Sequence, residues 1–101
     1  MEELLFRMIT IKSILSKRGP QKDKVIEIAK QFGGLEITHL QPSTKKTLES
    51  NLGRINQILT SYPINAFEDY RYIPEHHLSE MLKLYRKVCN AIIRDVVNHS
   101  N

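Results

Sequence analysis

The chain of 101 residues suits one domain with a modest hydrophobic core, and its apolar fraction of 41% is that of a folded protein, which argues against disorder. No apolar run approaches the roughly 18 residues of a membrane-spanning helix. No secretion signal opens the chain and Cys89 has no second cysteine to pair with, so we expect a cytoplasmic protein. The formal net charge of +4 favours an acidic partner: nucleic acid, an anionic membrane surface or an acidic protein.

The first two predicted helices cover residues 2–17 and 20–32. In the first helix, apolar side chains recur at steps of three and four residues: Leu4, Met8, Ile11 and Leu15. Gly19-Pro20 ends this helix, and a proline suits the first turn of the next one. The apolar side chains of the second helix have similar spacing: Val25, Ile28, Ala29 and Phe32. Gly33-Gly34 ends the second helix because glycine readily adopts the left-handed conformation of a helix C-terminus.

The middle of the chain contains a connector and a third helix. Residues 35–40 alternate imperfectly between apolar and polar side chains, which predicts an extended connector, or a small sheet with part of the N-terminus. The third helix is predicted over residues 44–61, with Ser43 as its N-cap. Lys45 and Lys46 lie in its first turn, where the helix dipole disfavours cations. Such residues are better tolerated if they face an anion.

Residues 63–74 form a predicted loop that contains three aromatic side chains: Phe67, Tyr70 and Tyr72. One interpretation is a loop that Phe67 and Ile73 hold against the core. The other is an aromatic surface for a protein partner. Pro74 and Glu75 then begin a final helix that extends to residue 99.

The final helix has two faces. Its apolar side chains recur at steps of three and four: Leu78, Met81, Leu82, Tyr85, Val88, Cys89, Ile92, Ile93 and Val96. No acidic residue lies between Glu80 and Asp95, and a second stripe is basic and polar: Lys83, Arg86, Lys87, Asn90 and Arg94. The pattern predicts an all-α fold, a small bundle of about four helices with a short extended segment near 35–40, in a single domain of residues 1–101.

One motif in the first half of the chain suggests contact with DNA. Ala29 and Gly33 have the spacing of the first half of a helix-turn-helix. A second half that begins late would place Lys45 and Lys46 against DNA, with Arg54 on a phosphate. An ordinary helical hairpin is the alternative interpretation.

A second motif lies at the C-terminus. Arg94 and His99 form an Arg-x4-His pattern with a polar residue after the arginine. This pattern resembles the motif of the HEPN family of small helical ribonucleases and nucleotide-binding toxins. The resemblance covers six residues, and it implies that Arg94 would hold the scissile phosphate while His99 would serve in acid–base chemistry.

The sequence offers no strong pattern for a metal or a cofactor, and we expect neither. His76 and His77 are adjacent, so on a helix their side chains diverge by about 100° and do not chelate one metal together. Cys89 lies on the apolar face and is predicted to be a small core residue. We therefore expect a binding module and not an enzyme.

Two functional hypotheses follow, with a small HEPN-like ribonuclease as a remote third. The first is a nucleic-acid-binding regulator that contacts phosphates through basic side chains: Lys45, Lys46, Arg54, Lys83, Arg86, Lys87 and Arg94. The second is a protein-interaction module (an adaptor, an inhibitor or an immunity-type protein) that uses the last helix and the aromatic loop: Phe67, Tyr70, Tyr72, Leu84 and Ile93. Leu84 and Ile93 broaden the apolar face of the last helix, which predicts a homodimer through that helix.

Overall fold

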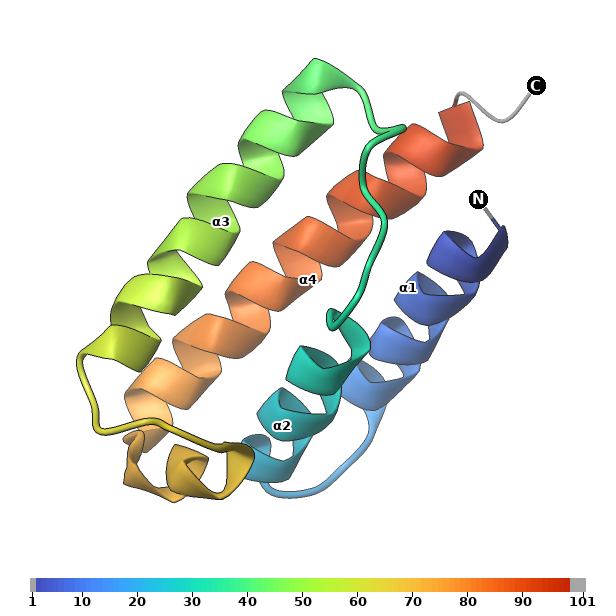
Figure 1. The fold of residues 1–101 in the computed structure, drawn as a ribbon. Coiled ribbons are helices and arrows are strands. Elements are labelled where there is room, and N and C mark those ends of the chain that lie inside the picture. The colour runs from blue at the N-terminus through green and yellow to red at the C-terminus, as the bar shows by residue number, and fades with distance from the viewer. Residues whose placement is uncertain (1, 99–101) are drawn as a thin grey trace.

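The computed structural model describes residues 2–98, with side chains described from Glu3 onward (Figure 1). Within this range the elements are four α-helices and one short 3-10 helix: α1 (Glu2–Ser16), α2 (Gln21–Gln31), α3 (Pro42–Thr60), η1 (Phe67–Tyr72) and α4 (Glu75–Asn98). The predicted all-α bundle is confirmed. Residues 35–40 form an irregular segment and a turn, and no strand occurs within residues 2–98, so the alternative of a small sheet is wrong.

Helix α4 is the centre of the fold. It runs between α3 on one side and the α1–α2 pair on the other, and it packs against all three helices (Figure 1). Helices α2 and α3 each pack on α4 and do not pack on one another. The helix-turn-helix arrangement that the Ala29 and Gly33 spacing suggested is therefore not formed, because its two helices would have to be in contact.

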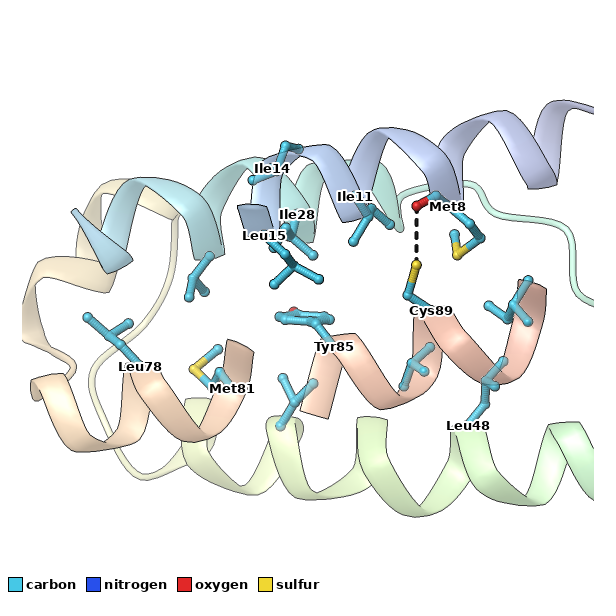
Figure 2. Packing of buried hydrophobic residues seen from close by; sticks show 14 of the residues in the cluster. Met8, Ile11, Ile14, Leu15, Ile28, Leu48, Leu78, Met81, Tyr85 and Cys89 are labelled. Carbon is cyan, nitrogen blue, oxygen red and sulfur yellow. Dashed lines mark hydrogen bonds between the residues drawn. The ribbon is translucent and has the colours of Figure 1, made fainter. Parts of the chain in front are cut away.

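The core is built on the apolar face of α4. Side chains of α4 point toward α1 and α2 and also toward α3, where Leu48 is buried (Figure 2). The largest fully buried side chains come from all four α-helices: Met8, Ile11, Ile28, Ile58, Met81, Ile92, Val25, Val88 and Cys89. The thiol of Cys89 donates a hydrogen bond to the Met8 carbonyl oxygen at 3.2 Å, and burial raises the pKa of Cys89 to about 11. The prediction that Cys89 is a core residue is confirmed.

The end of α2 is held by a side chain from α1. Gly34 has a φ of 68°, in the left-handed region that glycine adopts without steric cost. The Arg7 guanidinium donates hydrogen bonds to the carbonyl oxygens of Gln31 and Gly33 at 3.1 and 2.8 Å. A cation at the negative end of the helix dipole is favourable, so Arg7 has a structural role at this site.

The start of α3 differs from the prediction. The helix begins at Pro42 with Gln41 in the N-cap position, so the assignment of Ser43 as N-cap is wrong. Proline fits the first turn because it has no N–H to leave unsatisfied. The buried carboxylate of Asp95, on α4, accepts a hydrogen bond from the Gln41 backbone N–H at 2.8 Å. Since α3 has no acid in its own first turn, Asp95 supplies the anion that favours the positive end of the α3 dipole.

The segment between α3 and α4 contains the helix η1 where a loop was predicted. The Asp69 carboxylate accepts hydrogen bonds from the backbone N–H groups of Asn65 and Ala66, which caps η1. Ile73 is buried, as predicted for an anchor of this segment. The aromatic anchor is Tyr70, which is 5% exposed, and not Phe67, which is 39% exposed.

Candidate nucleic-acid interface

Four basic side chains lie exposed on the side of α4 that faces away from the core: Lys83, Arg86, Lys87 and Arg94. At about 100° per residue they fall within an arc of about 100° around the helix. At about 1.5 Å per residue they extend over about 17 Å of its length. The buried side chains of α4 occupy the opposite side, so packing of the core holds this stripe outward.

Helix α1 adds a cation that the sequence analysis did not identify. The Lys12 ammonium donates a hydrogen bond at 2.9 Å to the side-chain oxygen of Asn90, in the middle of the stripe. An amide oxygen holds the ammonium in place without neutralising its charge. We call the five side chains together the basic face: Lys12, Lys83, Arg86, Lys87 and Arg94.

The nearest acid on the outer side of α4 is neutralised by a partner from α3. The Arg54 guanidinium donates two hydrogen bonds to the Glu80 carboxylate, at 2.7 and 3.1 Å. The hydrogen bond from Arg54 lowers the pKa of Glu80, and the same contact raises the pKa of Arg54. Arg54 was predicted to contact a phosphate, but its guanidinium is occupied by Glu80. We therefore remove Arg54 from the candidate interface.

The remaining predicted cations of α3 lie apart from the basic face. Lys45 precedes Arg54 by nine residues, or about two and a half turns, so it lies on the opposite side of α3. Since Arg54 faces the outer side of α4, Lys45 faces away from that side. Lys46 is exposed, about 80° around α3 from Arg54. The seven cations predicted to bind nucleic acid therefore do not form one continuous surface. Only the four on α4 lie together on one side of a helix.

The predicted protein-interaction residues also divide into exposed and packed groups. Phe67 and Tyr72 are 39% and 48% exposed, with Lys30 and Arg71 over their respective rings at 5.3 and 4.9 Å. Tyr70 is buried, so it is not available to a partner. The other two packed residues lie partly buried against the core: Leu84 and Ile93. The apolar side chains on which the homodimer prediction rested are therefore largely used inside the protein.

The structure gives only part of the arrangement that the HEPN resemblance implies. Arg94 is exposed on the basic face, while His99 lies outside the described residues. Asp95, the polar residue after the arginine, is buried and bonded to the start of α3. Within the described part of the chain, no three histidine, cysteine or acidic side chains gather as a metal site would require. Of the helices described, none is both long and apolar enough to cross a membrane.

The Tyr62 hydroxyl and the His77 ring nitrogen Nδ1 form a short hydrogen bond of 2.5 Å that joins the end of α3 to the start of α4. The centroids of the His76 and His77 rings lie 4.2 Å apart in the first turn of α4, so the expectation that these side chains diverge is wrong.

Comparisons with protein-family models, with curated proteins and with solved structures find no match to this chain.

Proposed function

We propose that the protein is a non-enzymatic regulator that binds nucleic acid, and that phosphates of the backbone lie on the basic face. The observation that carries the proposal is the gathering of five cations from α1 and α4 on one side of the molecule. Among the side chains of residues 3–98, the ion pairs are Arg7–Glu3 and Arg54–Glu80, and neither uses a cation of the basic face. Unpaired cations are the ones that gain most from a phosphate partner.

The dimensions of the basic face suit a nucleic-acid backbone. Its length of about 17 Å along α4 equals about five steps of a strand that rises about 3.4 Å per phosphate. The face combines two guanidinium groups, which bind phosphate oxygens bidentately, with three ammonium groups, which act as point charges. Asn90 lies among these cations, and its amide N–H groups can donate to a further acceptor while its oxygen accepts from Lys12.

A protein partner is the second candidate function. The exposed rings of Phe67 and Tyr72 on η1 favour it, because aromatic side chains are enriched at protein interfaces. Those rings belong to η1 and not to the basic face, so variants of α4 separate the two functions.

The experiment is a titration of fluorescently labelled DNA and RNA pools, followed by anisotropy, at salt concentrations from about 50 to 200 mM. We compare the wild type with Lys87→Gln/Arg94→Gln and with the matched control Arg18→Gln/Lys22→Gln. Both pairs remove one lysine and one arginine from exposed positions, and the control pair lies at the α1–α2 turn.

Because each phosphate contact contributes about 0.7–0.9 to the slope of log affinity against log salt, the variant on α4 should lose about 1.4–1.8 of that slope. The control should keep the wild-type slope, with a uniform and small loss of affinity. Equal slopes for the two variants would contradict the proposal, as would the absence of binding at the lowest salt concentration.

A further inference from the structure

The apolar side chains that are most exposed lie on α1 and near the end of α4. Phe6 is 70% exposed, Ile9 is 56% exposed and Val97 is 58% exposed. We call these three residues the apolar patch. Single exposed hydrophobic residues are common on protein surfaces, but these three lie at the same end of the α1–α4 pair.

The hydrogen bond between Lys12 and Asn90 places Ile9 and Val97 beside the basic face, and Phe6 continues the apolar patch outward around α1. Ile9 precedes Lys12 by three residues, and Phe6 precedes Ile9 by three, so these side chains are neighbours along α1. Val97 follows Asn90 by seven residues, or about two turns, and lies on the same side of α4.

Helices α1 and α4 run antiparallel, so the start of α1 and the end of α4 lie at the same end of the molecule (Figure 1). From the Lys12–Asn90 bond, therefore, Ile9 and Val97 both lie toward that end. Leu5 and Ile93 lie one turn from Ile9 and Val97 and are partly buried against the core, so they continue the apolar surface inward. The side of the molecule formed by α1 and α4 is apolar near the termini and basic toward its middle.

We infer that this side binds a single strand of nucleic acid, with its phosphates on the basic face and its unstacked bases on the apolar patch. The inference rests on the proposed function and names the form of nucleic acid. A duplex keeps the flat faces of its bases inside the helix, whereas a single strand presents them to apolar and aromatic side chains. The Phe6 ring is the side chain of the patch best suited to stack on a base.

The charge of the neighbouring cations favours this occupant over a second copy of the chain. A two-fold dimer through the patch would bring two copies of the basic face close to one another, and like charges would repel. A strand of nucleic acid instead carries phosphates, which would neutralise the basic face, and bases, whose flat surfaces would cover the apolar patch.

The test compares a labelled single-stranded oligonucleotide with a duplex of the same length, over salt concentrations from about 50 to 200 mM. The variant is Phe6→Ala/Ile9→Ser, and the control is Tyr72→Ala, which removes an exposed aromatic ring from η1. Because the replaced side chains are exposed, we expect circular dichroism to show the same helical content in all three proteins.

The wild type should prefer the single strand, and Phe6→Ala/Ile9→Ser should weaken that binding by about 5- to 100-fold without changing the salt slope. Duplex binding and the control should change less than about twofold. Equal affinity for single strand and duplex, or an unchanged affinity of the variant, would overturn the inference while the proposed function stands. If the wild type bound neither the single strand nor the duplex at low salt, both the inference and the proposed function would be refuted.

Two further outcomes would also overturn the inference. One is a light-scattering mass of two chains that returns to one chain in Phe6→Ala/Ile9→Ser, which would assign the patch to a second copy. The other is binding to vesicles of anionic phospholipid that depends on Phe6 while single-strand binding does not.

Discussion

Replacement of Asp95 by alanine should destabilise the protein because this side chain joins the two longest helices. Asp95 is 4% exposed and accepts the Gln41 N–H at 2.8 Å. A hydrogen bond to a charged group contributes about 1.5–3 kcal/mol, and an acid at a helix N-terminus contributes about 0.3–1 kcal/mol within the same contact. We therefore expect a loss of about 2 kcal/mol in the free energy of unfolding.

The assay is urea unfolding followed by circular dichroism at 222 nm, with a thermal scan beside it. A loss of about 2 kcal/mol lowers the urea midpoint by about 1–2 M and Tm by about 8–16 °C. Asp95→Asn keeps an acceptor oxygen, so it should recover about half of the loss, since hydrogen bonds to charged groups are about twice as strong as neutral ones.

The control is Asp23→Ala, which removes an exposed acid from the first turn of α2 and should cost only about 0.3–1 kcal/mol. If Asp95→Ala unfolded within about 0.5 kcal/mol of the wild type, the reasoning would be refuted. The same would follow if Asp23→Ala cost as much as Asp95→Ala.

Three predictions concern titratable side chains. Glu80→Gln removes the acid that occupies Arg54, so nucleic-acid affinity should rise and the salt slope should increase by about 0.7–0.9 in the anisotropy titration; an unchanged slope would show that Arg54 does not reach the strand. The lowered pKa of Glu80 means that its ion pair stabilises the fold above the unfolded-state pKa and loses this effect as pH falls through the lower folded-state pKa. Burial raises the pKa of Cys89 to about 11, so its thiol is largely protonated at pH 8 and is also shielded from reagents. A disulfide reagent should therefore leave the native thiol unmodified and react at once in denaturant, and rapid reaction of the native protein would contradict the burial.

The features that could be predicted from sequence are those in which near neighbours along the chain decide the outcome. The two faces of α4 follow from spacing within one helix, and Gly33-Gly34 ends α2 through its own backbone preference. Each of these elements needs no knowledge of what packs beside it.

The features that could not be predicted depend on pairing between distant elements. Lys12 joins the basic face through Asn90, which lies 78 residues later, and Arg54 is removed from it by Glu80, which lies 26 residues later. The spacing of apolar residues predicts which side of α1 is buried. It does not predict which helix packs on either side of α1. The lysine at that edge was therefore overlooked.

The aromatic segment shows the same limit at shorter range. Phe67 and Tyr70 have similar apolar surface, and which ring enters the core depends on the turn of η1 that follows from its Asp69 cap. Asp69, two residues after Phe67, was a signal for that cap in the sequence, but the loop interpretation gave it no role.

The position of α4 between two groups of helices that do not touch has a consequence for how the structure opens. Because α3 packs on α4 and not on α1 or α2, its separation from α4 would leave the contacts of α1 and α2 with α4 intact. Opening of this kind is sub-global, and its free energy is lower than that of complete unfolding. The basic face and the apolar patch belong to α1 and α4, so they stay assembled when α3 separates. The surface that we propose to bind nucleic acid would therefore remain assembled in this partly opened state.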